Sequence, residues 1–179
     1  ARRPAATGST GSRMTTTERL RLSAGFGSSD RIAALRTGEV TAHGIELDLN
    51  IASPSEIFAR MCGDLSYDVA EMSMGAYAYL VGSGDRSMVG LPAFTSRAFR
   101  HAMVYAASGS DIRCPADLNG KRIAIREWGM TAVVWIIGIL AEEHGLDVRS
   151  IDWVAVRPPR VPIPMPEGAS LRYLAPGET

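Results

Sequence analysis

Strand-like and helix-like segments alternate along this chain, which narrows the folds open to it. Ile45–Ile51 alternates apolar and polar side chains with a period of two, as a half-buried strand does. The next segment begins with SPSE, in which Ser53 can accept a hydrogen bond from the amide three residues later and Glu56 can reach back to the Ser53 amide. Pro54 suits the first helical position, so a helix is predicted over Ser55–Cys62.

The same alternation continues to residue 156. Further strands are predicted at Arg19–Gly25, Tyr67–Met72, Val89–Pro92, His101–Ala107, Arg122–Ile125 and Ile151–Val156. Further helices are predicted at Ser29–Leu35, Ser73–Val81 and Met130–His144, with a short helical turn at Cys114–Leu118. Because strands separated by helices pair in parallel, the sequence predicts an α/β fold.

The two ends of the chain differ from this pattern. Residues 1–18 are small, polar and basic and lack the apolar core of a secretory signal. We expect them to form a disordered N-terminal extension. Met14 is the expected natural start, so residues 1–13 could alternatively be a mis-assigned upstream segment, and the cytoplasm is the default compartment. Residues 157–179 contain six prolines. We expect an extended tail there, without a further strand or helix.

Composition excludes several classes of function. The 179 residues include 19 Lys and Arg and 19 Asp and Glu, so the basic excess of nucleic-acid-binding proteins is absent. No run reaches the roughly 18 apolar residues that a membrane span needs. Cys62 and Cys114 are far apart, and His43, His101 and His144 are scattered, so neither a metal site nor a disulfide is expected.

One connection between predicted strands carries two arginines and a histidine. In LPAFTSRAFRHAMVY, which starts at Leu91, these are Arg97, Arg100 and His101. Guanidinium groups can grip carboxylates with paired hydrogen bonds, and an adjacent imidazole can move a proton near neutral pH. The set would suit a small carboxylic acid. The alternative is a solvated turn followed by a strand histidine.

Three further loops follow predicted strands, where α/β sheets bind ligands. Gly27–Arg31, Glu71–Gly75 and Glu127–Thr131 fall at these positions. The candidate side chains in them are Asp30, Arg31, Glu71, Ser73, Glu127 and Thr131. Each has a structural alternative: a carboxylate could pair with a core arginine, a hydroxyl could simply start a helix, and Asp30 with Arg31 could form a surface ion pair of little energetic value.

The order of these motifs resembles the 4,5-dihydroxyphthalate decarboxylase family, within the type II periplasmic-binding-protein folds. The matching blocks are DRIAALRTGEV from Asp30, GIELDLN from Gly44, PSEIFARM from Pro54, YDVAEMSMGAY from Tyr67, LPAFTSRAFRHAMVY from Leu91, DLNGKRIAIREWGMTAVVWIIGIL from Asp117 and IDWV from Ile151. The resemblance covers about Leu20–Val154.

The resemblance implies a two-lobed fold with a ligand cleft between the lobes. Residues 19–99 would form the first lobe and residues 100–156 part of the second, with residues 157–179 as the proline-rich tail. The crossover would fall near Arg100–Ala107 and bring Arg97, Arg100 and His101 to the cleft. Members of this family are considerably longer, and AVRPPRVPIP replaces their loop after the WV strand, so a truncated second lobe is expected.

The implied activity is release of CO2 from a small aromatic dicarboxylic acid, without an organic cofactor. Arg97 and Arg100 would hold carboxylates, and His101 is the first candidate proton donor. Glu71 or Glu127 would bind ring hydroxyls or share the proton transfer.

Four further residues are candidate contacts for the acid. The hydroxyls of Ser73 and Thr131 lie where helices begin and suit an anion, while Asp30 and Arg31 come from a third loop. Two alternatives stay open: a solute-binding protein for a small carboxylate, and an inactive fragment. The expected partner is the small-molecule carboxylate, with no nucleic acid and no membrane, and self-association into a homo-oligomer is left open.

Overall fold

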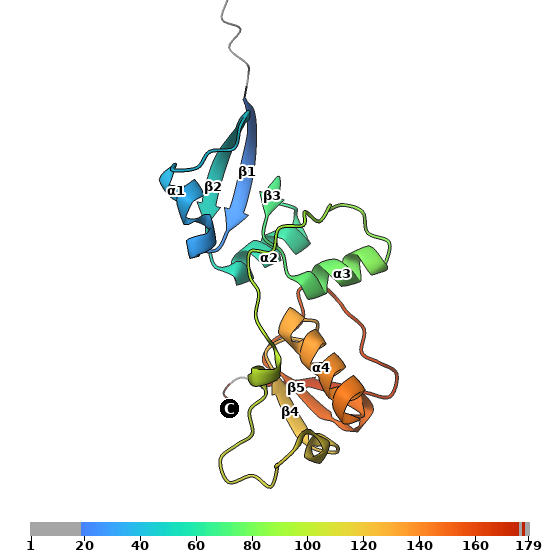
Figure 1. The fold of residues 1–179 in the computed structure, drawn as a ribbon. Helices are drawn as coiled ribbons and strands as arrows, with labels where there is room; N and C mark the ends of the chain where they lie inside the picture. Colours follow the sequence, from blue (N-terminus) through green and yellow to red (C-terminus); the bar gives the residue numbers. More distant parts are fainter. Residues whose placement is uncertain (1–18, 176, 178–179) are drawn as a thin grey trace, which may run out of the picture.

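The first part of the chain forms a small parallel sheet. A computed structural model describes residues 19–175 and 177, so the predicted extension at residues 1–18 lies outside the described residues. Strands β1 (Leu20–Phe26), β2 (Ile45–Ile51) and β3 (Val69–Ala70) pair in parallel in the order β2-β1-β3. The arrowheads of β1 and β2 point toward the rest of the molecule (Figure 1).

Helices connect these strands, as the alternation predicts. They are the 3-10 turn η1 (Asp30–Ile32), α1 (Ala33–Thr37), α2 (Pro54–Gly63) and α3 (Met74–Gly82). Half of the predicted capping box of α2 is confirmed, because the Ser53 hydroxyl accepts a hydrogen bond from the Glu56 amide at 3.2 Å. The Glu56 carboxylate instead pairs with Arg60 one turn later, at 3.5 Å.

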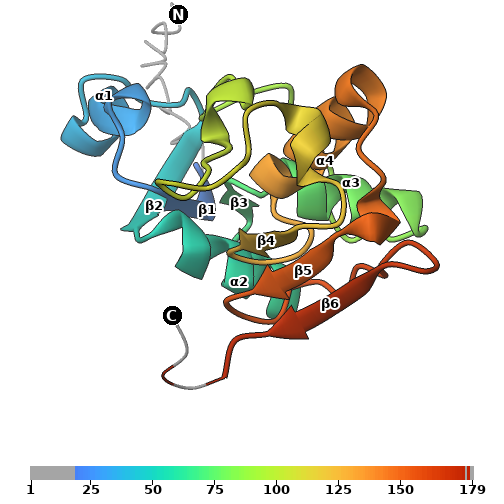
Figure 2. The ribbon, with the colours of Figure 1, turned by 90° about the horizontal axis from the view of Figure 1, so that it is seen from below.

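A second parallel sheet follows and has the larger core. Its strands β4 (Arg122–Ile125), β5 (Asp152–Ala155) and β6 (Ser170–Tyr173) lie in the order β4-β5-β6 (Figure 2). Helix α4 (Thr131–His144) and the 3-10 turns η3 (Pro115–Leu118) and η4 (Val148–Ser150) complete it. Buried side chains from α4, β5 and their connections form this core, including Trp128, Val133, Leu140, Ile151 and Trp153. The α/β class is therefore confirmed.

Two predicted strands are wrong. Val89–Pro92 has no strand, and His101–Ala107 begins as the 3-10 turn η2 (His101–Met103) and continues as unpaired backbone. A strand needs a hydrogen-bonding neighbour, and none of the described residues supplies one here. The side chains of these segments are accordingly uncovered: Val89 is 85% and Tyr105 is 87% exposed.

The tail after residue 156 was also wrongly predicted to lack a strand. Ser170–Tyr173 pairs with β5 as β6, in a parallel register that sets Trp153 beside Leu171. The described prolines of the tail all precede this four-residue strand, so they do not interrupt its hydrogen bonds. Strand β6 covers an edge of β5 that would otherwise present unpaired backbone groups.

Within the described part of the chain, no helix is long and apolar enough to cross a membrane.

Candidate functional site

The carboxyl ends of strands from both sheets lie close together in the region between the two sheets, which we call the junction. Glu71 follows β3, Glu127 follows β4 and Arg157 follows β5. Hydrogen bonds cross this junction from Arg157 to Ser55 on α2 and from Gly75 on α3 to Thr131 on α4. Since the carboxyl ends of parallel strands are where α/β folds bind ligands, the junction is the candidate site.

Glu71 organises one side of the junction. The Gly27 amide donates to Oε1 of Glu71 at 2.5 Å, and the Thr95 hydroxyl donates to Oε2 at 3.1 Å. Arg31 donates through Nη1 to the Thr95 carbonyl at 2.8 Å. Glu71 therefore links the β1 loop to the connection that carries Arg97. Asp30 lies exposed at the start of η1, and no ion pair joins it to Arg31 in the described residues.

Ser73 and Thr131 bring the starts of α3 and α4 together. Their hydroxyl oxygens lie 3.0 Å apart, and the Gly75 amide donates to Oγ1 of Thr131 at 3.0 Å. Ser73 is buried. A Cβ on Gly75 would lie 2.7 Å from the Gly129 carbonyl oxygen, so only glycine permits this approach. The two predicted hydroxyls are thus in contact, although they are 58 residues apart in sequence.

Glu127 is a buried carboxylate held by two arginines. It is 3% exposed, and its Oε1 accepts from Nη1 and from the amide of Arg160 at 2.9 and 3.1 Å. Its Oε2 accepts from Nε of Arg157 at 2.9 Å, with Nη2 of the same guanidinium at 2.8 Å. Both carboxylate oxygens are engaged, so Glu127 is built to position the two guanidiniums.

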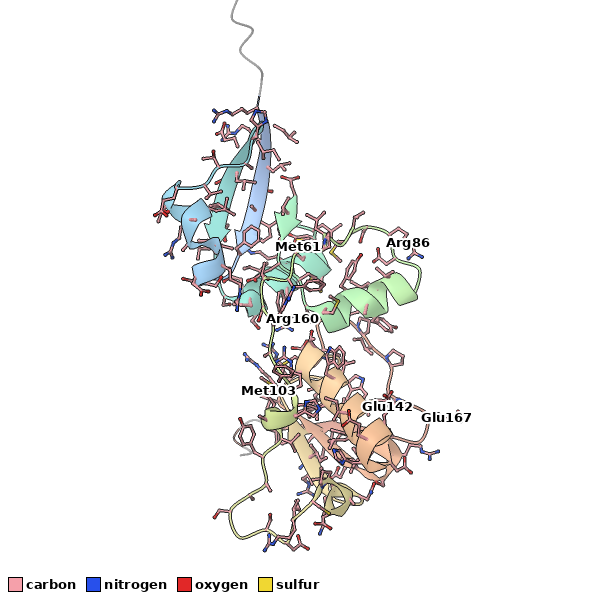
Figure 3. All side chains as sticks on the ribbon, in the orientation of Figure 1. Met61, Arg86, Met103, Glu142, Arg160 and Glu167 are labelled. Atoms are coloured by element: carbon pink, nitrogen blue, oxygen red, sulfur yellow. The ribbon has the colours of Figure 1, made fainter. Side chains whose placement is uncertain are left out.

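Arg157 and Arg160 were not predicted from the sequence. They lie directly after the predicted strand Ile151–Val156, in the position where α/β folds place ligand contacts, and that signal could have found them. The proline-rich composition of this segment instead led to its assignment as a tail. Arg160 lies between the two sheets (Figure 3), with its guanidinium 5.9 Å from the centre of the Phe58 ring.

Arg97, Arg100 and His101 lie apart from the junction contacts. Arg97 is exposed, and its guanidinium stands over the Phe94 ring at 5.1 Å. Arg100 donates to the Met103 sulfur at 3.3 Å. Arg100 and His101 line a hollow of about 300 Å³ beside α4, whose lining does not include Arg97.

That hollow combines basic and apolar side chains. Arg113 and His144 join Arg100 and His101 on its wall. Its apolar lining includes Ile136, Ile139 and Leu140, on one face of α4. The predicted candidates other than Arg97 and Asp30 therefore fall into four groups: the Glu71 group with Arg31, the Ser73–Thr131 contact, the Glu127 cluster, and the hollow beside α4.

Burial sets the electrostatics of the Glu127 cluster. Desolvation lowers the pKa of the Arg160 guanidinium, while the Glu127 charge opposes this shift. Desolvation also raises the pKa of the nearby Cys62 thiol, against the attraction of Arg160. Cys62 and Cys114 are both free thiols. Among the residues that the structure describes, no group of three or more His, Cys, Asp or Glu side chains is placed to hold a metal ion.

Comparison with known proteins gives two close matches, while no protein-family model matches the chain. A 4,5-dihydroxyphthalate decarboxylase from Comamonas testosteroni is 36% identical over 167 residues, which cover 90% of this chain and 51% of that protein. A 4,5-dihydroxyphthalate decarboxylase from Pseudomonas putida is 38% identical over 136 residues, which cover 76% of this chain and 53% of that protein. The resemblance drawn from the motifs is confirmed, and the chain spans about half the length of these relatives.

Proposed function

Since this chain is a sequence relative of the 4,5-dihydroxyphthalate decarboxylase family, we propose that a polypeptide containing it releases CO2 from a small aromatic dicarboxylic acid of this type. The observation that carries the proposal is the identity of 36–38% to two proteins of that name. The junction supports it, because cationic and hydroxyl side chains gather at the carboxyl ends of strands from two sheets.

We further propose that the two sheets belong to the two lobes of a type II periplasmic-binding-protein-like fold. Residues 19–99 supply the sheet of the first lobe, and residues 100–156 supply β4, α4 and β5 of the second. The tail adds β6 to the same second sheet, so we assign residues up to Tyr173 to the second lobe as well. The support for this proposal is that both sheets are parallel and that hydrogen bonds join them at strand ends.

The protein must bind the carboxylates of the acid and supply a proton to the ring carbon. A hydroxyl group para to the departing carboxylate pushes electron density to the ring carbon that holds it. The bond between that carbon and the carboxylate breaks, the electron pair stays on the carbon, the carbon takes up a proton, and CO2 leaves. Water must be kept out of the site while the charged intermediate exists.

His101 and Glu71 are the proposed acid–base residues. His101 would supply the proton, since an imidazole exchanges protons near neutral pH. Glu71 already accepts from the Thr95 hydroxyl and would accept a ring hydroxyl in the same way. Arg97 and Arg100 remain the carboxylate contacts proposed from the sequence, with Ser73, Thr131, Asp30 and Arg31 around the ligand.

Turnover with 4,5-dihydroxyphthalate tests this proposal. The expected result is equimolar CO2 and 3,4-dihydroxybenzoate, the product that remains when one carboxylate is replaced by hydrogen. His101→Ala should slow the reaction by about 100-fold, the lower range for a lost general acid. Saturable binding of 4,5-dihydroxyphthalate without any CO2 would refute the proposed activity and favour a solute-binding protein.

A further inference from the structure

A serine hydroxyl on α2 lies between two guanidinium groups of the opposite sheet. Nη2 of Arg160 donates to Oγ of Ser55 at 2.6 Å, and Nη2 of Arg157 donates to the same oxygen at 3.1 Å. A neutral hydroxyl oxygen is a modest partner for two cations. A carboxylate oxygen in this position would accept both hydrogen bonds with the added attraction of opposite charges.

The charges around Ser55 leave a positive excess. Glu127 carries one negative charge against the two positive charges of Arg157 and Arg160, and both its oxygens are already engaged by them. The charge of Arg126 also acts on Arg160 and adds to the excess. The cluster therefore keeps a net positive charge, which an anion from outside the cluster would reduce.

The guanidiniums are held in place before any ligand arrives. Glu127 is almost fully buried and fixes both through contacts of 2.8–2.9 Å. The Arg160 side chain is 16% exposed and that of Arg157 is 37% exposed, so each group still has a route to solvent. Among the described residues, Nη1 of Arg157 and Nε of Arg160 have no hydrogen-bond partner. Fixed donors with unused N–H groups bind an anion at a low entropic cost.

We propose that Arg157 and Arg160 form a clamp for one carboxylate of the aromatic acid, with the Ser55 oxygen marking the position of a carboxylate oxygen. This inference rests on the proposed function for its ligand class. Glu127 is the positioning residue of the clamp. The Phe58 ring beside Arg160 gives the aromatic ligand an apolar neighbour. The clamp holds one carboxylate at the junction, which leaves the other carboxylate for Arg97 and Arg100 on the exposed connection.

An aspartate at position 55 would place a carboxylate between Arg157 and Arg160 and should prevent the ligand carboxylate from binding there. In Ser55→Asp, the new side chain supplies a negative charge from within. We expect the ligand-free variant to melt at a higher temperature than the wild type. We also expect it to bind phthalate at least 10-fold more weakly in isothermal titration calorimetry. Ser53→Asp is the matched control, because it adds the same charge two residues earlier and keeps a good N-cap for α2. Its phthalate affinity should equal that of the wild type.

Two further measurements complete the test. Arg160→Gln should also weaken phthalate binding at least 10-fold, and dimethyl phthalate, which has no charge, should not bind the wild type. Unchanged phthalate affinity in Ser55→Asp, or no phthalate binding by the wild type, would overturn the clamp. Phthalate binding that depends on Arg160 without release of CO2 would support the clamp and refute the proposed activity. CO2 release at the same rate in the wild type and in Ser55→Asp would support the proposed activity and refute the clamp.

Discussion

Replacing Glu127 by glutamine should strongly destabilise the fold. Glutamine keeps the shape of the side chain but removes the negative charge. It also puts an NH2 group where Glu127 now accepts hydrogen bonds from Arg160 or from Arg157. Two cations would then face each other at the junction with no anion between them.

The expected loss follows from the burial of the partners. Breaking a buried ion pair by removing one partner costs about 3–5 kcal/mol, because an uncompensated charge stays in the protein. The Arg157 side chain is 37% exposed and water compensates part of its charge, whereas that of Arg160 is 16% exposed. We therefore expect about 3 kcal/mol, at the lower end of this range.

Equilibrium unfolding in urea measures this loss through the shift of the midpoint at constant m-value. Glu142→Gln is the matched control, because Glu142 lies exposed on α4 (Figure 3) and should change the stability by less than about 0.5 kcal/mol. The double variant Glu127→Gln with Arg160→Gln should be less destabilised than the sum of the single changes. A loss below about 1 kcal/mol for Glu127→Gln would refute the view that this carboxylate holds the junction together.

Three further predictions concern stability and dynamics. Gly75→Ala should cost about 1–3 kcal/mol in urea unfolding, because its Cβ would meet the Gly129 carbonyl oxygen at 2.7 Å; Gly82→Ala on the same helix has open space and should not destabilise, so equal losses would argue against the close approach. Hydrogen bonds from the Arg113 and Cys114 amides lower the pKa of Asp117. The ionised carboxylate therefore stabilises the folded state at pH values above the ordinary pKa of an aspartate, and this contribution is lost as the pH falls through the lowered pKa. Asp117→Asn should therefore lower the melting temperature at pH 7 but have little effect near pH 2, and a loss that is the same at both values would contradict this. Strand β5 has neighbours on both sides and is mostly buried, whereas β2 is an edge strand. In hydrogen exchange, the amides of β5 should therefore exchange at least about 10-fold more slowly than those of β2. Faster exchange in β5 than in β2 would contradict this fold.

Local sequence signals predicted the elements that local interactions determine. The strand Ile45–Ile51 follows from its period-two pattern, and the start of α2 follows from Ser53 and Pro54. The predicted strand His101–Ala107 failed because apolar β-forming residues do not guarantee a neighbouring strand. Strand β6 was missed because its four residues are stabilised mainly by their pairing with β5, which the sequence alone does not reveal.

The candidate site could be predicted only in part, for the same physical reason. Glu71, Ser73, Glu127 and Thr131 were proposed as candidates because they follow predicted strands or start helices, and the structure places them at the junction. Their partners were not proposed, because Glu127 contacts Arg160 from 33 residues away and Arg160 contacts Ser55 from 105 residues away. Such contacts depend on how the two sheets meet, and local spacing carries no information about that.

We propose that an aromatic dicarboxylate binds where the strand ends of the two sheets meet. A crystal structure with bound 4,5-dihydroxyphthalate tests it most directly. We expect a ligand carboxylate on Arg157 and Arg160, with the ring close to Glu71 and Thr131. A bound ligand whose carboxylates contact neither Arg157 nor Arg160 would contradict this placement.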